Sequence, residues 1–471
     1  MSERPNVLWL MTDEQRADSM GYAGTPWAHT PHLDRVASSG VRFTAAYTPS
    51  PVCVSARACI LTGRAGSSIG VLNNHHVLAL DDPGYLTWQF ATAGYQVASF
   101  GKQHYNGHRR AFDLEGGRVL GEQVGYFAYR VPVDADRAGV VRYDGGESPW
   151  LFAGRYPGTV DDTPEMENVR QALDWLSRRD PSRPYLLRVS LNAPHTPVVT
   201  PAPFDSLIDA SAIALPIESP DALTFASDTQ RDFLCAYAGT QRLDQAQIRR
   251  ARQCYYGHVA FVDHVFGRLL EGLGGMGELD NTVIAYVSDH GAHLGDHGVF
   301  RKQSFWDAAA RVPFFFAGPG IDAQEIATPV NIGSLLPTLM DWAGIDIPSD
   351  AHYPSLVAAL DGKGGAAEGP VFSEIDLGLW GYRCGERRVM VRNGRWKLIL
   401  YRDPRDPERF AGREDAVLFD LETDPDERHN LAPDPSCRHV IEALSIKIDA
   451  WDQSRPIVAA RSRATHSPAA H

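Results

Sequence analysis

The chain has 471 residues, of which 44% are hydrophobic and 22% are charged, and its formal net charge at pH 7 is −13. This length favours one large and one small domain, and the composition is that of a globular protein. The acidic balance disfavours nucleic acid and anionic membranes as partners, because both need a basic face. A small anionic substrate is still compatible with this charge, since a metal ion and a few lysines can reverse the local field.

The sequence also bears on the compartment in which the protein works. The first apolar run, residues 7–11, is far too short for a signal sequence or a membrane span, and no later stretch approaches spanning length. The six cysteines are scattered, with neither a C-x-x-C pair nor a zinc-like spacing. We therefore expect a cytoplasmic protein whose thiols are reduced.

Short runs of β-branched and aromatic residues alternate with helix-length segments through residues 1–365, which predicts an α/β domain built on a mostly parallel sheet. The expected strands are residues 6–12, 95–101, 185–191, 282–288 and 312–317. The expected helices are residues 30–40, 163–178, 253–272 and 334–343. Thr30 and Thr163 each precede a proline, which is the order of an N-cap and a first helical residue.

The pattern changes near the Gly-rich residues 361–369, which predict a linker. Beyond it, four β-rich runs precede a helix at residues 438–451 and a frayed tail at residues 461–471. The four runs are residues 371–375, 387–392, 396–401 and 417–421, and Asn393-Gly394 predicts a hairpin turn between two of them. We assign residues 366–471 to a small α+β domain.

Polar, basic or metal-binding side chains follow four of the predicted strands, at the point where each strand ends. They are Asp13 and Glu14, Lys102 and His104, His195, and Asp289 and His290. In open α/β sheets, ligands bind beyond the carboxyl ends of the strands. Any one of these residues alone could serve only a turn or a cap, but four sets at one edge predict a shared site.

The acids and one histidine of this set have the chemistry of a metal site. Asp13, Glu14, Asp289 and His290 offer carboxylate oxygens and one imidazole. Oxygen ligands favour calcium or magnesium, and the imidazole leaves manganese open. We expect one divalent ion, with calcium favoured. The alternative for Asp13 and Glu14 is an acid pair at a helix N-terminus, stabilised by the helix dipole.

Three cationic side chains are candidates for binding a tetrahedral anion. Arg57 offers a fixed fork of donors, whereas Lys102 and Lys302 offer point charges. For Lys302, a position on the exposed surface is an equally good interpretation.

Four further histidines have less specific surroundings. His293 and His297 lie in a Gly-rich segment and are candidates for ligands or for ordinary loop residues. His75 and His76 belong to a polar cluster with two asparagines, and we favour a solvated loop for both. The sequence holds no H-E-x-x-H zinc motif, no phosphate-binding P-loop and no G-x-S-x-G elbow.

Cys53 stands four residues before Arg57, and the segment ends on Leu61-Thr-Gly-Arg64. A free cysteine is usually a small buried residue, and a thiol needs partners to act as a nucleophile. This segment resembles the signature of type I sulfatases, in which the cysteine is oxidised after translation to formylglycine. The hydrated aldehyde carries two hydroxyls on one carbon, so that one attacks an ester and the other later expels the bound group.

Other motifs resemble the same family, in the family's order and over nearly the whole chain. They are Thr30-Pro-His-Leu-Asp-Arg35, Gly101-Lys-Gln-His104, Ala193-Pro-His-Thr-Pro197, Ser288-Asp-His-Gly-Ala-His-Leu-Gly-Asp-His-Gly298, Arg311-Val-Pro-Phe314, Gly394-Arg-Trp-Lys-Leu398 and residues 418–431. Sulfatases belong to the alkaline phosphatase superfamily. The resemblance therefore implies a large, mostly parallel sheet flanked by helices, with a smaller C-terminal α+β domain.

The resemblance also implies roles for individual residues. The metal ligands would be Asp13, Glu14, Asp289 and His290, with Cys53, as formylglycine, completing the set. The catalytic residues would be Cys53, Arg57 and Lys102 at the aldehyde hydrate, His104 assisting its breakdown, and His195 and Lys302 binding the transferred group and protonating the leaving oxygen. The implied partners are a small anionic ester and a formylglycine-generating maturation enzyme, and a homo-oligomer is a further partner that we consider.

Three residues differ from the commonest family pattern. Ser55 stands where the maturation motif usually has Pro or Ala, and Glu14 stands where many sulfatases have Asp. His290 stands where several sulfatases have Asn, and His occurs there in relatives that hydrolyse phosphonate monoesters and phosphodiesters.

A sulfuric ester hydrolase is the leading interpretation, and a phosphonate monoester or phosphodiester hydrolase with the same nucleophile is the alternative. A binding protein with an unconverted Cys53 is disfavoured, because every position needed for catalysis holds a competent residue. The alcohol part of the substrate has no readable code, and residues 109–155 and 201–244 are the candidate specificity segments.

Overall fold

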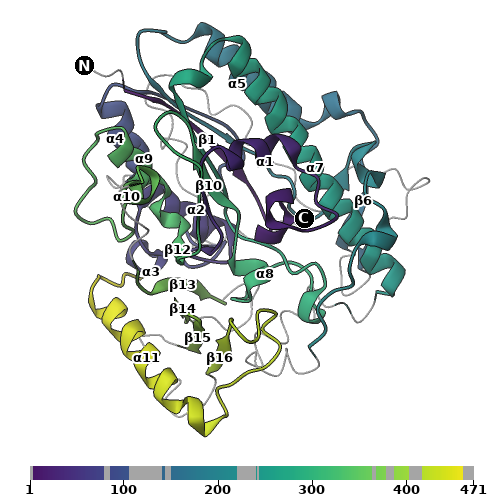
Figure 1. The fold of residues 1–471 in the computed structure, drawn as a ribbon, viewed down its shortest axis with the longest axis vertical. Helices are drawn as coiled ribbons and strands as arrows, with labels where there is room; N and C mark the ends of the chain where they lie inside the picture. Colours follow the sequence, from purple (N-terminus) through teal and green to yellow (C-terminus); the bar gives the residue numbers. More distant parts are fainter. Residues whose placement is uncertain are drawn as a thin grey trace, which may run out of the picture.

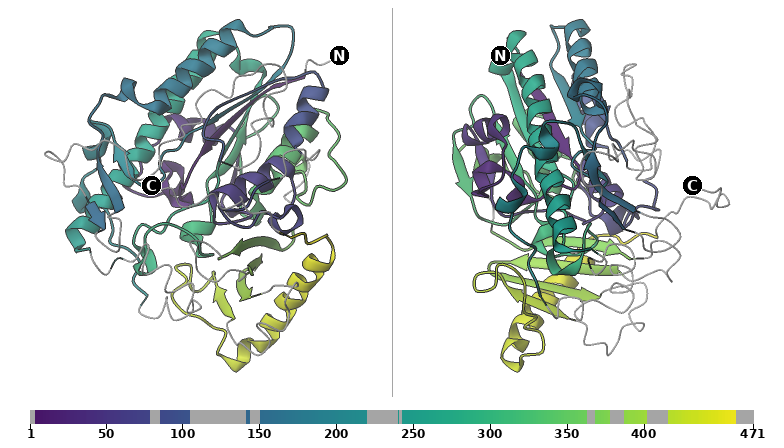
Figure 2. Two further views of the ribbon diagram at one scale, coloured as in Figure 1. Left: turned by 180° about the vertical axis from the view of Figure 1, so that it is seen from behind. Right: turned by 90° about the vertical axis from the view of Figure 1, so that its right-hand side faces the viewer.

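The structure is a computed structural model that describes residues 4–78, 85–104, 141–143, 150–219, 240, 243–362, 368–377, 387–401 and 416–459. Figure 1 shows a large central sheet between layers of helices, with a smaller sheet and helix α11 (Arg438–Gln453) at one end. Figure 2 shows the same arrangement from two further directions. Within the described ranges, no helix is long and apolar enough to cross a membrane.

The large sheet has seven strands in the order β11-β2-β10-β9-β1-β7-β4. Its strands are β1 (Asn6–Thr12), β2 (Val41–Phe43), β4 (Gln96–Gly101), β7 (Tyr185–Ser190), β9 (Thr282–Ser288), β10 (Phe314–Ala317) and β11 (Gln324–Ile326). The four strands β9, β1, β7 and β4 run parallel, and β10 runs opposite to both of its neighbours. The predicted mostly parallel sheet is confirmed. The short strands β2 and β11 at one edge have too few residues to show a pattern in the sequence.

The central strand β1 is buried on both faces of the sheet. Val7, Trp9 and Met11 pack on one face, and Leu8 and Leu10 pack on the other. Each such side chain contributes about 1.5–3 kcal/mol by leaving water. The first face is covered by α2 (Cys53–Thr62), α4 (Leu86–Thr92) and α9 (Leu335–Trp342), and the second by α1 (Pro31–Ser38), α5 (Pro164–Arg178) and α7 (Gln245–Gly275).

The start of one predicted helix needs correction, whereas α1 starts at Thr30-Pro31 as predicted. The helix expected at residues 253–272 begins at Gln245 instead, because Asp244 and Gln247 form a capping box that satisfies its first amides. Thr30 precedes α1, but its hydroxyl bonds to Asp34 and not to the amides of the first turn. Those amides are satisfied by Asp263 of α7, which no local sequence pattern reveals. Thr163 does cap α5, as predicted.

The C-terminal sheet is antiparallel and carries α11 on one face. Its strands are β13 (Val371–Asp376), β14 (Arg387–Asn393), β15 (Trp396–Tyr401) and β16 (Val417–Asp420). Asn393 pairs with Trp396 across the predicted hairpin turn. Val391 and Leu398 face Ile448 of α11, whereas Met390 packs in a cluster with Trp306 of the larger part. The domain boundary near residue 365 stays a prediction, and residues 363–367 and the tail at 461–471 lie outside the described residues.

Two small sheets were not predicted from the sequence. One consists of β5 (Val141–Tyr143), β6 (Trp150–Arg155) and β8 (Val198–Thr200), and the other of β3 (Ala46–Tyr47) and β12 (Val330–Asn331). Four of these five strands have only two or three residues, too few for an alternating pattern to stand out. Most of the predicted specificity segments, residues 109–155 and 201–244, lies outside the described residues.

A buried lysine joins the C-terminal sheet to the larger part of the protein. The ammonium of Lys397 in β15 donates to the carbonyl oxygen of Phe305 at 2.9 Å and to Glu427 Oε1 at 2.5 Å. It also donates to the carboxylate of Asp307, the first residue of α8 (Asp307–Ala310). The Lys397 side chain is completely buried, so its ammonium has lost its hydration. The ion pairs with these two acids offset that desolvation cost.

Replacing Lys397 by Met should lower the free energy of unfolding by about 3–5 kcal/mol, because the change leaves two carboxylates without their buried cation. The midpoint of urea unfolding measures the loss. Arg268→Met is the matched control, because it removes one partner of an exposed ion pair with Glu271 at 2.8 Å. The control should lose less than about 1 kcal/mol. Equal losses in the two variants would contradict the structural role of Lys397.

Candidate active site

The carboxyl ends of β1, β4, β7 and β9 bring the predicted side chains to one place. Arg57 reaches this edge from α2, where Cys53 is the first helical residue. At the end of β4, Gly101 has a φ of 87°, and a Cβ there would stand 2.0 Å from the carbonyl oxygen of Ser190. Only glycine permits this close turn, which places Lys102 at the edge of the sheet. The predicted convergence of four strand ends is therefore confirmed.

Arg57 is the link between the two acids that follow β1 and β9. Its Nη2 donates to Asp13 Oδ2 at 2.9 Å, and its Nε donates to Asp289 Oδ2 at 2.7 Å. Lys102 Nζ lies 2.7 Å from the same oxygen of Asp13. Burial by itself would raise the pKa of Asp13, but Lys102, His195 and Arg57 outweigh it and hold the pKa well below its usual value. Asp13 is therefore a carboxylate.

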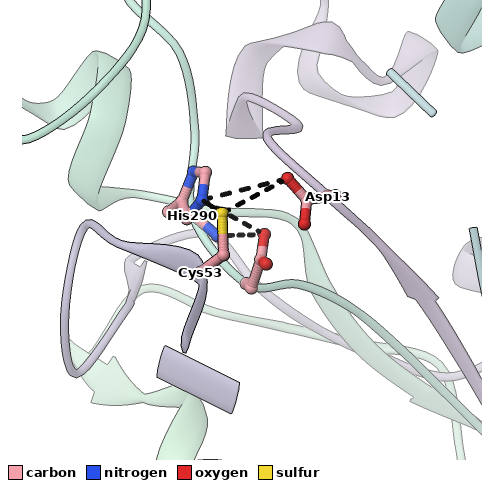
Figure 3. A group of neighbouring side chains, drawn as sticks. Asp13, Cys53 and His290 are labelled. Atoms are coloured by element: carbon pink, nitrogen blue, oxygen red, sulfur yellow. Dashed lines mark hydrogen bonds and ion pairs between the residues drawn. The ribbon is translucent and has the colours of Figure 1, made fainter. Parts of the chain in front are cut away.

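Cys53 faces the other side of the two acids. Its Sγ lies 3.1 Å from His290 Nε2 and 3.7 Å from Asp13 Oδ1. Figure 3 shows the side chains of Asp13, Cys53 and His290 pointing toward one another. One atom each from Asp13, Cys53, Asp289 and His290 lies within 4.8 Å of the other three. We call these four residues the Cys53 group.

The Cys53 group fits a divalent cation. His290 Nδ1 lies 3.0 Å from the carbonyl oxygen of Gly291, which accepts a hydrogen bond from the ring and orients Nε2 toward the carboxylates. Burial lowers the pKa of His290, but Asp289 outweighs burial and raises the pKa to about 9. The carboxylates thus stabilise positive charge at this point. Cys53 Sγ stands in for the oxygen that formylglycine would present, which completes an oxygen-rich set with one imidazole.

Glu14 lies beside the Cys53 group with Lys302 and His195. Lys302 Nζ donates to Glu14 Oε2 at 2.9 Å and to His195 Nε2 at 2.7 Å. His195 Nε2 is also 3.7 Å from Asp13 Oδ1, so Asp13 contacts both sets of residues. Lys302 is buried, and its interpretation as an exposed surface lysine is wrong. The carboxylate of Glu14 faces this pair, and its role as a metal ligand stays a prediction.

The charges around the thiol favour an anion at position 53. Burial and Asp13 would raise the pKa of Cys53, but Lys302, His290 and Lys102 hold it well below its usual value. Burial and Lys302 lower the pKa of His195, which is therefore a neutral imidazole at pH 7. The site thus sets a cationic lysine beside a neutral histidine, which is an arrangement able to donate and accept a proton.

His104, the last of the predicted residues, also reaches this place. Its side chain hydrogen-bonds to that of Cys53, and burial lowers its pKa. Its backbone φ is 49°, in the left-handed region. The structure therefore brings all ten predicted site residues together.

Three residues at the site were not predicted from the sequence. Asn74 Oδ1 accepts from the amide of Val54 in the first turn of α2 at 3.0 Å, and Ser190 Oγ accepts from Arg57 Nη1 at 2.9 Å. Thr48 donates to the carbonyl oxygen of Asp289 at 2.5 Å. The Asn-Asn-His-His cluster was a weak signal for Asn74. The other two give no signal, because they contact the site from positions distant in sequence.

The other histidines have structural positions. His75 is exposed, as expected of a solvated loop, but His76 is buried and its Nδ1 accepts from the amide of Leu72 at 2.9 Å. The expectation of a solvated loop is therefore wrong for His76. His293 lies 2.6 Å from Ser304 Oγ, and His297 stacks on Trp306. Among the described residues, neither belongs to a group able to hold a metal.

The chain is similar to known proteins over almost its whole length. A family model described as Sulfatase matches residues 5–345, and one described as N-sulphoglucosamine sulphohydrolase, C-terminal, matches residues 295–454. An arylsulfatase of Clostridium perfringens is 26% identical over an alignment of 466 residues, which covers 94% of this chain and 93% of the relative.

Two solved structures share the fold over almost their whole length. A phosphonate monoester hydrolase from Silicibacter pomeroyi aligns over 98% of this chain and 99% of its own, with 23% identity and a TM-score of 0.77. A protein solved in complex with its substrate D-glucosamine-2-N,6-O-disulfate aligns over 96% of this chain and 98% of its own, with 22% identity and a TM-score of 0.74. These two likenesses concern the fold. The Sulfatase model matches well over half of the residues, and the chain therefore belongs to the sulfatase family.

Proposed function

We propose that this protein cleaves a sulfate monoester at the Cys53 group, with formylglycine formed from Cys53 as the nucleophile. Membership of the sulfatase family makes it a hydrolase that acts on sulfuric esters. The observation that carries the proposal is the position of Cys53 Sγ, 3.1 Å from His290 and at the first residue of α2. A helix N-terminus and nearby cations favour an anionic oxygen at this point.

We propose that Asp13, Asp289 and His290, with Glu14 beside them, hold one divalent ion. Such an ion, when bound, polarises the ester oxygens and lowers the pKa of a hydroxyl near it. The carboxylate oxygens favour calcium, and the imidazole of His290 makes manganese the rival. Arg57 donates to Oδ2 of both acids. Oδ1 of each acid is therefore the oxygen that faces the Cys53 group.

Lys102 and Lys302 would bind the sulfate group. Lys102 lies over Asp13, and Lys302 lies between Glu14 and His195. A sulfate ester has three outer oxygens, and both ammonium groups are close enough to Cys53 to lower the pKa of its thiol. His104, hydrogen-bonded to the Cys53 side chain, is placed to take a proton from the hydroxyl that expels the bound group.

His195 and Lys302 would act on the leaving alcohol. The Nδ1 of His195 donates to the carbonyl oxygen of Thr196, which leaves its Nε2 as the acceptor from Lys302. A proton carried by this pair would lie next to the oxygen of the leaving alcohol. Negative charge develops on that oxygen as its bond to sulfur breaks. The geometry suits a leaving group that departs as an alcohol rather than as an alkoxide.

A phosphonate monoester or phosphodiester hydrolase is the second candidate. The observation that favours it is His290, because an imidazole at this position also occurs in relatives of that activity. Formation of formylglycine by a maturation enzyme, a cytoplasmic location and a homo-oligomer are further parts of the proposal that rest on the sequence.

The nucleophile is tested by mass and by turnover. The tryptic peptide that contains residue 53 should weigh about 18 Da less than its cysteine form, because one oxygen replaces a sulfur and two hydrogens. Cys53→Ala should abolish hydrolysis of an aryl sulfate, whereas Cys59→Ala, a buried cysteine on the same helix, should keep it. Undiminished turnover in Cys53→Ala would exclude the proposed nucleophile. Faster turnover of an aryl phosphonate than of an aryl sulfate by the unaltered protein would favour the second candidate.

Asp289→Asn should weaken divalent metal binding by more than about 100-fold. Changes to residues that only hydrogen-bond to a metal ligand already cost about 10–100-fold in affinity, and Asp289 is a proposed ligand itself. Elemental analysis of the purified variant and calorimetric titration with calcium and manganese measure the effect. Asp280→Asn, a change at an exposed acid before β9, should bind as the unaltered protein does. A fully active protein without any metal would contradict the proposed site.

His195→Ala should lose about 10²- to 10⁴-fold in kcat on an alkyl sulfate, because the alkoxide then leaves without its proton. The loss on a nitrophenyl sulfate should be far smaller, since nitrophenolate departs without a proton. Steady-state kinetics on both esters measure the difference. Lys302→Ala should follow the same pattern, unless the lysine mainly binds sulfate oxygens and both esters suffer alike. Equal losses on both esters for both variants, with folding unchanged, would refute a proton donor at this pair.

A further inference from the structure

The backbone at Glu14 adopts a conformation that needs support from outside its own turn. Its φ is 64°, in the left-handed region that residues with a side chain rarely adopt. Glu14 is nevertheless buried, and its carboxylate meets Lys302 at 2.9 Å. A strained residue in such a position persists only when its surroundings hold it.

Tyr255 of α7 supplies one of the contacts that hold this turn. Its hydroxyl donates to the carbonyl oxygen of Glu14 at 2.7 Å and accepts from the amide of Arg16 at 2.9 Å. One oxygen atom thus joins the two backbone groups on either side of residue 15. The Tyr255 side chain is buried, so no bulk solvent replaces this hydroxyl if it is removed.

The other side of the turn is connected to the Cys53 group. The amide of Glu14 donates to Asp289 Oδ1 at 3.1 Å, and that oxygen lies 3.7 Å from His290 Nε2. The conformation of Glu14 therefore sets two directions at once: that of its own carboxylate, toward Lys302, and that of its amide, toward Asp289.

We infer that Tyr255 is a positioning residue for the divalent ion, which acts through the backbone of Glu14 on the carboxylates of Glu14 and Asp289. The inference rests on the proposed function for the presence of that ion. Tyr255 itself contacts neither the substrate nor the reacting atoms. Tyr255 affects the arrangement of the carboxylates before the ion binds. Residues that orient metal ligands without touching the metal usually act in this way.

The neighbouring residue offers a matched control. Tyr256 is buried on the same helix, and its ring meets that of Tyr255 edge-on at 5.6 Å. It also packs against Trp27, with ring centroids 5.8 Å apart. Tyr255→Phe and Tyr256→Phe each remove one oxygen atom from a buried tyrosine. A general loss of stability should therefore affect both variants, whereas a positioning effect should affect Tyr255→Phe alone.

The experiment is a calorimetric titration of the metal-free proteins with calcium and, separately, with manganese. We expect Tyr255→Phe to raise the Kd of the ion that the unaltered protein binds by about 10-fold, and Tyr256→Phe to leave it within about 2-fold. Circular dichroism at the same temperature confirms that each variant is folded. An unchanged Kd in Tyr255→Phe, or an equal rise in both variants, would overturn the inference.

Amide hydrogen exchange provides a second measurement that needs neither the metal nor a variant. In the unaltered, metal-free protein, the amide of Arg16 should exchange slowly, because it donates to a buried hydroxyl. Rapid exchange at Arg16 would overturn the inference even if Tyr255→Phe did not fold. If the unaltered protein bound neither ion, the metal part of the proposed function would fail, and slow or rapid exchange at Arg16 would still decide whether Tyr255 holds the turn.

Discussion

The site depends on one buried guanidinium. Arg57 donates to Asp13 and Asp289 with different nitrogens, so two buried carboxylates that follow separate strands are held at fixed positions. Burial raises the pKa of Asp289 to about 6, in spite of Arg57 and with the help of the nearby charge of Asp13. Two acids this close would repel each other or take up a proton if the arginine were absent. Arg57 can hold them because it stands on α2, whose ten residues are all buried.

The same helix carries the reacting residue, and this joins the electrostatics to the geometry. Cys53 and Arg57 are four residues apart and therefore lie on the same side of α2. A shift of the helix would move Cys53 and Arg57 together, so the position of the nucleophile relative to the arginine that holds the two acids is preserved. Asn74 ties the first turn of the helix to a neighbouring loop, and Gly63 ends the helix with a φ of 64°. The spacing of four residues in the family motif thus has a mechanical reason.

The sequence permitted a good prediction of the site because its residues follow strands of a parallel sheet. The rule that ligand groups lie at the carboxyl ends of such strands placed Lys102, His195 and Asp289 together without any knowledge of the structure. The same reasoning could not find Ser190 or Thr48. Their contacts join segments far apart in the chain, and a hydroxyl residue has no local pattern that distinguishes such a role. For Lys302, composition alone gave equal weight to the surface and the site, and only the ion pair with Glu14 decides between them.

Helix ends and short strands were predicted less well for a related reason. Thr30-Pro31 marks the start of α1 correctly, but the amides of its first turn donate to Asp263, more than 200 residues later in the chain. The early start of α7 has a local signal in the capping box of Asp244 and Gln247, but no apolar periodicity marks its first turns. Long-range contacts of this kind follow from the packing of α1 against α7, which the sequence pattern does not encode.

The buried lysine of the C-terminal sheet has a consequence for the order in which the protein is made. Asp307 leaves the ribosome 90 residues before Lys397, its buried counterion. During that interval its carboxylate has Arg311, four residues later, but not the buried ammonium of Lys397, and contact with water stabilises it better than burial does. The amide of Gly291, next to His290, donates to the carbonyl oxygen of Ala309 in the same short helix, α8. The native environment of α8, and with it this support for the loop that carries His290, is therefore complete only when β15 has been synthesised.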